Sequence, residues 1–382
     1  MGMKTLYSKS RPKFITFFLP ALSGGGAERA ILNLAIELNK KGYKVNFFLV
    51  HKIGAYLKYV PEEIQILSFE GLIGKRFKMP QSIIPLIHYL KKEKPDVLLS
   101  AMNPCNFIAI IAKLISKAQT KIAINEQNTF SSEIQHTSWF RKKIDPYLIK
   151  FLYPKADFII AVSKGVADDL SKISGIPKNK INIIYNPVNV AEISEKSKEK
   201  ILHPFFQEKS NGIIINVANL NKQKNHLLLI ETFSILRKIR DVRLIILGEG
   251  EERKNLEKII NKLNLWEFIS MPGFVENPYA YIAQSNVFVL SSLYEGLPTV
   301  LIEAMACGTS IVSTDCPSGP AEILENGQYG KLVPINDPEA LAEAIKETLD
   351  NPINPQVLRE RANYFSTEKA ADRYLELLFK NS

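Results

Sequence analysis

Short apolar runs alternate with helical patterns along the whole sequence. Residues 14–19 have the composition of a buried strand, a helical spacing of apolar residues follows until Gly42, and residues 45–50 form the next apolar run. Further strand-like runs follow in two series, at residues 96–100, 121–125, 158–162 and 181–184, and at residues 212–217, 243–247, 268–271, 287–290, 310–313 and 331–333. Strands that alternate with helices pair in parallel. The predicted fold class is α/β, with two doubly wound parallel-sheet domains.

A fold of this class restricts where a ligand can bind. In open α/β sheets ligands bind beyond the carboxyl ends of the strands. A chain with two such sheets has a natural site in the cleft that its domains face. Functional residues are therefore expected in the loops that follow the predicted strands.

Length and composition fit a soluble globular protein. With 382 residues, 46% of them hydrophobic, the chain can bury two cores of ordinary size. No apolar run approaches the roughly 20 residues that span a bilayer. The apolar segment from Phe14 to Leu22 is interpreted as a first strand rather than a signal peptide, because a glycine-rich loop and a helical pattern follow it directly. The three cysteines form no Cys-x-x-Cys pair, which favours a reducing cytoplasm.

Positive charge is concentrated in one half of the chain. Residues 1–190 hold 28 Lys and Arg against 13 Asp and Glu, whereas residues 191–382 hold 21 against 26. A basic half is expected to face a polyanion or an anionic lipid surface, although a lysine-rich solvated surface would give the same composition. Nucleic acid is disfavoured, since no recognised binding motif accompanies the charge. The residues predicted to face a membrane or an acceptor are Lys75, Arg76, Lys78, Trp139, Arg141, Lys142 and Lys143.

Two glutamates lie around a predicted helix start. Pro298 suits the first helical position, because its missing N–H would have no partner there, and Glu295 then lies in the preceding loop. Glu303 is the only charged residue from Thr299 to Cys307, and a buried carboxylate without a partner is costly. Hydroxyl groups of a ligand would satisfy it, while free N–H groups at the helix start would bind an anion. The pattern suggests a sugar nucleotide; alternatively, Glu295 only complements the helix dipole and Glu303 pairs with a core Lys or Arg.

Four further loops at strand ends have residues suited to phosphate or sugar. Bare backbone in a glycine-rich loop at a helix start can approach a phosphate, although a tight turn would explain the glycines equally well. The sequence contains no Asp-x-Asp or His-Glu-x-x-His motif and no His spacing typical of a metal site. A diphosphate would then depend on helix dipoles and protein cations, with Lys224 as the leading cation. The four loops are residues 24–29, 219–226, 248–250 and 273–275.

Together these motifs resemble those of retaining glycosyltransferases of family 4 (glycosyl transferases group 1), which have the GT-B fold. The resemblance covers nearly the whole chain. The matching segments are Gly24-Gly25-Gly26-Ala27-Glu28, Ala161 to Val166, Ile184 to Val188, Lys224-Asn225-His226, Leu247 to Gly250, Gly273-Phe274-Val275, and Glu295 to Glu303 with Gly308.

The resemblance implies a domain order. Residues 1–190 would form an N-terminal Rossmann-like acceptor domain, and residues 191–365 a C-terminal Rossmann-like donor domain. Residues 366–382 would form a helix that packs back on the first domain, and Thr367 to Phe379 has the amphipathic pattern for it. The charged segment from Ser194 to Lys200 is interpreted as a connector.

The resemblance also implies roles for individual residues. Glu295 would face the donor sugar and the reacting region, Lys224 would hold the diphosphate, and Glu303 would bind the ribose hydroxyls. The other residues of the implied donor site are Gly24, Gly25, Gly26, Asn219, Gly248, Glu249, Phe274, Val275, Gly296, Leu297, Pro298 and Thr299.

Two positions depart from the family pattern. Asn219 stands where the family commonly has Arg, which removes one expected phosphate cation. Gln127 stands where many relatives have His, so no His is assigned to catalysis. Glu126 and Gln127 are instead predicted to contact the sugar or the acceptor.

The expected function is retaining transfer of a hexose or N-acetylhexosamine from a nucleotide sugar, with UDP as the expected nucleotide. The acceptor would be a lipid-linked or cell-surface glycan in the biosynthesis of a bacterial polysaccharide, lipopolysaccharide or other glycan. No cofactor or metal is expected, and the enzyme is predicted to be cytoplasmic and peripheral on the inner face of the cytoplasmic membrane. The alternatives are a UDP-sugar epimerase of the same architecture and a non-catalytic protein that binds a membrane or a polyanion.

Overall fold

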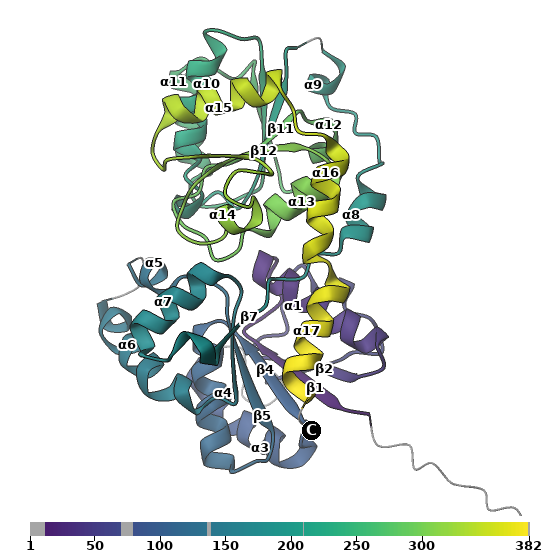
Figure 1. Cartoon of the computed structure of the whole chain (residues 1–382), viewed down its shortest axis with the longest axis vertical. Coiled ribbons are helices and arrows are strands. Elements are labelled where there is room, and N and C mark those ends of the chain that lie inside the picture. Colours follow the sequence, from purple (N-terminus) through teal and green to yellow (C-terminus); the bar gives the residue numbers. More distant parts are fainter. Residues whose placement is uncertain (1–11, 70–78, 136–138, 209, 381–382) are drawn as a thin grey trace, which may run out of the picture. The chain divides into compact units, whose positions relative to one another are not determined.

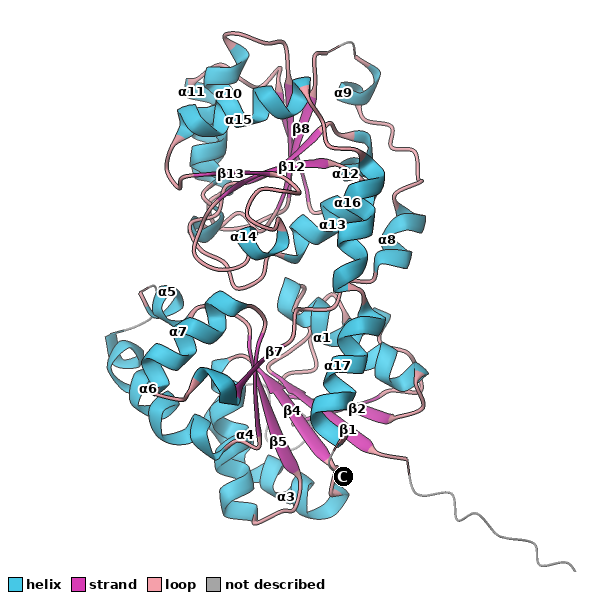
Figure 2. Ribbon diagram, in the orientation of Figure 1, coloured by secondary structure: helices cyan, strands magenta, loops and turns pink. Residues whose placement is uncertain are grey.

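The computed structural model describes residues 12–69, 79–135, 139–208 and 210–380 (Figure 1). The chain divides into two compact units, of which the first comprises Met1–Asn125, Leu148–Ile159 and Leu375–Ser382, and the second Glu126–Tyr147 and Ile160–Tyr374. The chain contains two sheets, each flanked by helices (Figure 2). The predicted α/β class with two doubly wound parallel sheets is confirmed. The domain boundaries at residues 190 and 365 stay predictions.

The first sheet has seven strands in the order β3-β2-β1-β4-β5-β6-β7. Its strands are β1 (Phe14–Leu19), β2 (Lys44–Leu49), β3 (Gln65–Ser68), β4 (Val97–Ala101), β5 (Lys121–Glu126), β6 (Phe158–Ala161) and β7 (Ile181–Ile183). Every residue of β1 is buried, because the strand lies in the middle of a parallel sheet that is covered on both faces. Strand β1 pairs with both β2 and β4, so the order in which strands are added reverses between β1 and β4.

The second sheet has six parallel strands in the order β10-β9-β8-β11-β12-β13. Its strands are β8 (Ile213–Val217), β9 (Arg243–Leu247), β10 (Ile269–Gly273), β11 (Val287–Leu290), β12 (Ser310–Thr314) and β13 (Lys331–Val333). A continuous apolar core packs against this sheet, with Phe233, Leu244 and Val289 among its buried members. Here the order of the strands reverses between β8 and β11, and such a point is where open α/β sheets bind ligands.

The helices alternate with the strands along the chain. They are α1 (Gly26–Lys40), α3 (Ile83–Glu93), α4 (Asn103–Ser116), α5 (Phe130–Ile134), α6 (Trp139–Leu152), α7 (Lys164–Ser174), α8 (Val190–Lys196), α9 (Pro204–Gln207), α10 (His226–Arg237), α11 (Arg253–Lys262), α12 (Pro278–Gln284), α13 (Thr299–Cys307), α14 (Pro320–Ile323), α15 (Pro338–Asp350), α16 (Pro355–Ala362) and α17 (Thr367–Phe379). Short 3-10 helices are η1 (Leu57–Tyr59), η2 (Met79–Ser82), η3 (Tyr153–Lys155), η4 (Lys178–Lys180), η5 (Lys222–Lys224) and η6 (Asn363–Phe365).

Residues with known capping preferences set several of the helix ends. The hydroxyl of Ser163 accepts a hydrogen bond from the N–H of Val166 and begins α7, and Gly175, at φ 74°, ends it. The carboxylate of Asp337 caps α15 in the same way through the N–H of Ala340. Gly308, at φ 84°, ends α13. Local sequence therefore accounts for these boundaries.

Most predicted strands are confirmed within one or two residues, and the final helix is confirmed at Thr367–Phe379. Strand β3 was not predicted, because it is a four-residue edge strand with no fully buried residue. The interpretation of residues 194–200 as a connector is wrong for its first three residues, which form the last turn of α8. That helix is short and charged, and Asn189 caps it through the N–H of Glu192.

The predicted absence of a membrane span and of a disulfide frame can be compared with the structure. Among the described residues, no helix is both long and apolar enough to cross a bilayer. All three cysteines are free and buried. Burial raises the pKa of the Cys307 thiol to about 12 and raises that of Cys105 well above its usual range. These thiols are therefore protonated at neutral pH and are poor nucleophiles.

Candidate active site

The candidate site lies where two neighbouring strands of the second sheet end. The loop after β8 contains η5 and Lys224, and the loop after β11 contains Glu295. Strands β8 and β11 are paired and parallel, so their following loops leave the sheet at the same edge and at the point where the strand order reverses. The fold brings together two residues that are 71 positions apart in the sequence.

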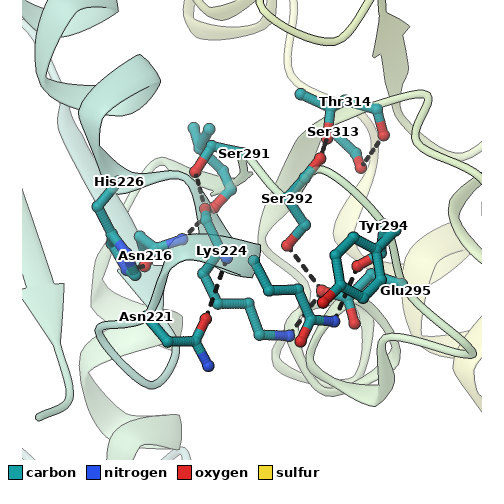
Figure 3. A network of polar contacts seen from close by, with 12 residues as sticks. Asn216, Asn221, Lys224, His226, Ser291, Ser292, Tyr294, Glu295, Ser313 and Thr314 are labelled. Atoms are coloured by element: carbon teal, nitrogen blue, oxygen red, sulfur yellow. Dashed lines mark hydrogen bonds and ion pairs between the residues drawn. The ribbon is translucent and has the colours of Figure 1, made fainter. Parts of the chain in front are cut away.

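Lys224 and Glu295 form a largely buried ion pair (Figure 3). Nζ of Lys224 lies 2.6 Å from Oε1 of Glu295, and the side chains are 21% and 7% exposed. The same carboxylate oxygen accepts a hydrogen bond of 2.6 Å from the hydroxyl of Ser292. In the described part of the chain, no residue donates a hydrogen bond to the other oxygen, Oε2. One oxygen of Glu295 is thus fixed by the protein, and the other can accept from a ligand.

Hydrogen bonds join the two loops beneath this ion pair. The side-chain amide of Gln223 donates to the carbonyl of Tyr294 at 2.9 Å, and the carbonyl of Gln223 accepts from the N–H of Leu293 at 2.8 Å. The hydroxyl of Ser291 donates to the carbonyl of Lys224 at 2.8 Å. The carbonyl of Ser292 accepts from the hydroxyl of Thr314, on β12, at 2.7 Å. These contacts hold the lysine and the carboxylate in one arrangement without a ligand.

A buried histidine lies directly behind Lys224. Nε2 of His226 donates to Oδ1 of Asn216 at 3.0 Å, and the amide of Asn216 donates to the carbonyl of Val289 on β11 at 2.8 Å. Burial, together with the positive charge of Lys224, lowers the pKa of His226 to about 4. The ring is therefore neutral at physiological pH, and its Nδ1 has no partner within the described residues. His226 links β8, β11 and α10 rather than carrying charge into the site.

Helix α13 begins immediately after the carboxylate loop. Pro298 has φ −72° and ψ 88°, so it is the N-cap, and α13 begins at Thr299. The prediction that Pro298 is the first helical residue is wrong by one position, because a ψ of 88° lies outside the helical region. Among the described residues, the N–H groups of Thr299 and Val300 donate to no acceptor, as expected for the first turn of a helix. Glu303, one turn further, is half-buried, and its Oε1 lies 3.5 Å from the hydroxyl of Thr299.

The loop before α13 is packed tightly from two sides. A Cβ added to Gly296 would lie 1.9 Å from the carbonyl oxygen of Gln127, so no other residue fits this position without moving the backbone. Gly319, at φ 97°, brings its backbone so near Pro298 that a Cβ there would lie 2.4 Å from the proline ring. The hydroxyl of Ser318 donates to the carbonyl of Gly296 at 2.9 Å. The loop carrying Glu295 is therefore rigidly supported.

The other predicted donor loops of the second unit follow strands β8, β9 and β10. Gly248, at φ 137°, allows the close approach of the loop after β8, since a Cβ would lie 1.9 Å from the carbonyl oxygen of Ala218. Glu249 is half exposed and pairs with Arg253 at 2.8 Å. Asn219 is exposed, and so is Phe274, of which 70% is accessible, while Val275 is half-buried. These side chains lie at the rim of the strand edge rather than in a buried site.

The predicted glycine loop lies in the first unit, after β1. Gly24 has φ 124°, Gly25 is the N-cap of α1, and Gly26 is the first helical residue. A Cβ on Gly25 would meet the carboxylate of Glu28 at 2.3 Å. That carboxylate accepts backbone hydrogen bonds from Gly25 and from Glu28 itself, while burial raises its pKa. Glu28 therefore supplies one half of a capping box on its own helix, the half in which the N3 carboxylate accepts from the N-cap N–H.

Glu126 and Gln127 both lie in the second unit and are buried. The side-chain amides of Gln127 and Asn186 form a reciprocal pair at 2.8 and 3.3 Å. The Gln127 carbonyl is the group that approaches Gly296. Gln127 therefore supports the carboxylate loop through its backbone, and its predicted contact with sugar or acceptor stays a prediction, as does that of Glu126.

The predicted membrane or acceptor surface is described only in part. Lys75, Arg76 and Lys78 lie outside the described residues. The second cluster begins α6, where Trp139 is 70% exposed, and Lys142 and Lys143 are exposed. Arg141 is instead half-buried and pairs with Asp145 at 2.8 Å. Arg141 is therefore held on the protein side of the helix.

Several residues of the site were missed by sequence reasoning. They are Ser291, Ser292, Gln223, Ser318 and Gly319. Ser291 and Ser292 directly follow the buried strand β11, and that position could have identified them. Ser318 and Gly319 lie in a Pro-Ser-Gly-Pro turn, a sequence that favours positive φ. Gln223 has no such signal, because its role depends on the loop that it faces.

No metal site is evident in the part of the chain that the structure covers, since no three His, Cys, Asp or Glu side chains cluster there. The positive groups at the strand edge include Lys224 and the N-terminus of α13. A helix start and a lysine are the groups that bind phosphate in many nucleotide sites. The expectation that no metal is required stays a prediction.

Two parallel α/β sheets, with charged and polar loops at the reversal point of the second, are the architecture of the GT-B class. Residues 24–192 match Glycosyltransferase Family 4, and residues 197–365 match Glycosyl transferases group 1. The chain belongs to this family of glycosyltransferases, as the sequence motifs predicted.

Its relatives include enzymes of bacterial glycan assembly. The N-acetylgalactosamine-N,N'-diacetylbacillosaminyl-diphospho-undecaprenol 4-alpha-N-acetylgalactosaminyltransferase of Campylobacter jejuni is 33% identical over 339 residues, which cover 87% of this chain and 89% of the relative. A lipopolysaccharide core biosynthesis glycosyltransferase of Rhizobium meliloti is 26% identical, over 93% of this chain and 96% of the relative. Anabaena Alr3699/HepE, solved in complex with UDP, has a TM-score of 0.77 at 17% identity and covers 96% of this chain and 100% of its own. That structural likeness concerns the fold.

Proposed function

We propose that this glycosyltransferase moves a hexose or N-acetylhexosamine from a UDP-linked donor to a lipid-linked glycan, with retention of the anomeric configuration. The observation that carries the proposal is the buried contact of Lys224, Ser292 and Glu295 at the reversal point of the second sheet. Relatives named for undecaprenol-linked and lipopolysaccharide substrates support the acceptor class. A structural neighbour that binds UDP supports the nucleotide.

The charges at this edge fit a nucleoside diphosphate with a sugar. Lys224 is neutralised by Glu295 before the donor binds. A diphosphate would compete for Lys224 and would also meet the N–H groups at the start of α13. Oε2 of Glu295 would accept hydrogen bonds from sugar hydroxyls, while Oε1 would keep its hydrogen bond with the hydroxyl of Ser292. Glu303, half-buried one turn into α13, would accept from the ribose hydroxyls.

In the proposed reaction the acceptor hydroxyl forms a bond to C1 of the sugar as the bond between C1 and the diphosphate oxygen breaks. The electron pair of that bond leaves with UDP, and the proton of the acceptor hydroxyl passes to the departing diphosphate oxygen on the same face. Negative charge grows on the diphosphate during this step. Lys224 and the amide groups at the start of α13 are fixed donors that would stabilise it without a divalent ion.

A panel of nucleotide sugars, measured by thermal stabilisation, tests the donor. We expect UDP sugars to raise the melting temperature, because a ligand that binds only the folded state stabilises it. Lys224→Ala should reduce that shift strongly, whereas Lys254→Ala, at an exposed lysine of α11, should leave it unchanged. If the sugars of another nucleotide raised the melting temperature and UDP sugars did not, this result would contradict the UDP assignment.

Product analysis tests the reaction. With a lipid-linked acceptor, we expect the coupling constant of the new anomeric proton to match that of the donor, and excess EDTA to leave the rate unchanged. An inverted product would contradict retention, and loss of activity with EDTA that Mg²⁺ restores would contradict metal independence. Conversion of the donor to its epimer without acceptor would identify a UDP-sugar epimerase instead.

We further propose that the enzyme works in the cytoplasm, on the inner face of the cytoplasmic membrane, where a lipid-linked acceptor would be reached. The excess of positive charge in residues 1–190, with 28 Lys and Arg against 13 Asp and Glu, supports contact with anionic lipid. Binding to anionic vesicles that weakens as salt rises is the expected result. Absence of binding at low salt would contradict the membrane contact.

A further inference from the structure

Helix α6 exposes four large aromatic side chains. Trp139 is 70%, Phe140 64%, Tyr147 66% and Phe151 64% exposed. At about 100° per residue in an α-helix, these four positions fall within a sector of about 120°. Soluble proteins rarely expose adjoining large apolar groups unless the surface binds something. One face of α6 is therefore a candidate interaction surface.

Cations are interleaved with these rings. Lys143 and Lys150 are exposed and fall in the same sector, and Lys142, also exposed, lies about 60° outside it. Nζ of Lys143 lies 4.3 Å from the centre of the Trp139 ring. None of these three lysines forms an ion pair within the described residues. The surface, named here the α6 outer face, consists of Trp139, Phe140, Lys142, Lys143, Tyr147, Lys150 and Phe151.

The opposite side of α6 is held by the protein. Ile149 is fully buried and Asp145 is 6% exposed. Asp145, the only carboxylate of the helix, pairs with Arg141 on that side at 2.8 Å. The acidic charge is thus turned inward and neutralised, while unpaired lysines and aromatic rings point outward. The sequence of the helix therefore sets this division of charge.

We propose that the α6 outer face docks this enzyme in the interface of an anionic bilayer. The rings would lie at the boundary of headgroups and acyl chains, and the lysines would extend to the lipid phosphates. Aromatic rings next to lysines are typical of membrane interfaces, whereas lysine is depleted in protein–protein interfaces. The inference deepens the proposed function, on which it rests, by naming the element that brings the enzyme to a lipid-linked acceptor.

Flotation of the full chain with vesicles tests the charge requirement. We expect binding to vesicles of phosphatidylcholine with 30% phosphatidylglycerol, and weak binding to phosphatidylcholine alone. Each lysine near an anionic surface contributes about fivefold in affinity, so loss of two lysines should weaken binding about 25-fold. Lys142→Glu with Lys143→Glu, which also adds two negative charges, should weaken binding at least that much. The matched control is Lys254→Glu with Lys258→Glu on α11, at two exposed lysines with the same change in net charge. Equal losses in the two double variants would overturn the proposal, because net charge alone would then explain binding.

Tryptophan fluorescence tests insertion. The chain has two tryptophans, so Trp266→Phe leaves Trp139 as the single reporter. We expect its emission to shift to the blue on anionic vesicles and to be quenched by lipids brominated near the headgroup. Bound protein whose Trp139 emission is unchanged would overturn the proposal.

Replacement of the rings tests the surface itself. Tyr147→Ser with Phe151→Ser should weaken vesicle binding more than tenfold with little effect on thermal stability, because both rings are already exposed. Leu202→Ser with Ile239→Ser, at side chains that are 89% and 64% exposed elsewhere, is the matched control and should bind normally. A dimer of the wild-type chain in solution that the ring variant abolishes would overturn the proposal by assigning the face to a second copy.

Transfer assays in two formats separate this inference from the proposed function. Tyr147→Ser with Phe151→Ser should retain the wild-type rate with an acceptor dispersed in detergent and lose at least tenfold with the same acceptor in vesicles. Transfer that is equally efficient in both formats would overturn docking through α6 but not the reaction. No transfer in either format, with Trp139 still inserting into vesicles, would refute the reaction but not the docking.

Discussion

The two sheets end differently at the points where their strand order reverses. In the second unit, the loops after β8 and β11 are joined by side-chain hydrogen bonds and by the buried pair of Lys224 and Glu295. In the first unit, the loop after β1 ends in Gly24 and Gly25, a third glycine begins α1, and the nearest carboxylate, Glu28, caps its own helix. One edge presents fixed charged side chains, and the other presents bare backbone.

This difference shows how one architecture can be given two tasks. Fixed dipoles and charges stabilise a developing charge without reorganising, so the second edge suits the diphosphate and the reacting sugar. A glycine loop contributes little side-chain specificity and can approach ligands of different shapes. We therefore expect substitutions at the second edge to affect the chemical step and those at the first edge to have smaller effects.

The largest expected effect is on the chemical step. Glu295→Gln keeps the shape and the contact with Ser292 but removes the charge that would act on the donor sugar. We expect kcat to fall about 10³-fold, while stabilisation by UDP persists. Glu249→Gln, at a half-exposed carboxylate on the rim, is the matched control and should lose less than tenfold. Equal rates for Glu295→Gln and the wild type would contradict the catalytic role.

A second prediction compares one glycine from each edge. In Gly296→Ala, the new methyl group would lie 1.9 Å from the backbone of Gln127, so the carboxylate loop must move. We expect a loss of activity of about a hundredfold, since small displacements at a reacting centre are costly. Gly25→Ala would meet only the end of the flexible Glu28 side chain and should lose less than tenfold. Steady-state kinetics with saturating donor would decide; a larger loss for Gly25→Ala would reverse the comparison.

A third prediction concerns pH. The pKa of His226 is lowered from 6.5 to about 4 in the folded protein, so between these values the unfolded chain binds a proton that the folded chain does not. The contribution of neutral, buried His226 to the free energy of unfolding is therefore fully present above pH 6.5 and is lost as the pH falls towards 4. The total loss is about 3 kcal/mol, at 1.36 kcal/mol per pKa unit. Urea unfolding at several pH values measures this, with Trp139→Phe so that Trp266 reports on the second unit.

In the His226→Gln variant this part of the pH dependence should disappear, because glutamine does not titrate. The variant is compared with the parent at pH 5 and pH 7, so that its own loss of stability cancels. An unchanged slope between these two values would show that another group is responsible.

The smallest expected effect is at the first edge. Glu28→Ala removes the carboxylate that accepts from the N–H of Gly25 and should destabilise α1 by about 0.5–1 kcal/mol. Transfer activity should change less than fivefold, because the proposed chemistry does not use Glu28. Thermal unfolding and a kinetic assay on the same sample measure both. A hundredfold loss of activity with normal stability would contradict this prediction and assign Glu28 to the active site.

Much of the fold and the centre of the site could be predicted from the sequence. Buried parallel strands read as continuous apolar runs, and the polar residues that follow them, Lys224 and Glu295, converge because parallel strands end at one edge. Strand β3 could not be predicted, since a four-residue edge strand with no fully buried residue has no such pattern. The partnership of Lys224 with Glu295 also required the structure, because pairing across two loops depends on their conformation.

The aromatic face of α6 was predicted only in its first turn. Pro146 lies within the helix, and proline usually ends or kinks a helix. The sequence alone therefore separates Trp139 and Phe140 from Tyr147 and Phe151, and the structure unites them on one face. Helical periodicity is therefore a poor guide to whether residues on opposite sides of a proline share one helix face.

The hydrogen bond from Thr314 to the carbonyl of Ser292 has a practical consequence for engineering. The carboxylate of Glu295 is tied through Ser292 to the interior of the sheet, whereas Asn219, Glu249 and Phe274 lie on exposed loops. Libraries aimed at a new sugar preference should therefore randomise the exposed positions and keep the serine–threonine tether. Substitutions at the exposed positions can then change which sugar is bound, while the contacts of Ser292 with Glu295 and Thr314 stay intact.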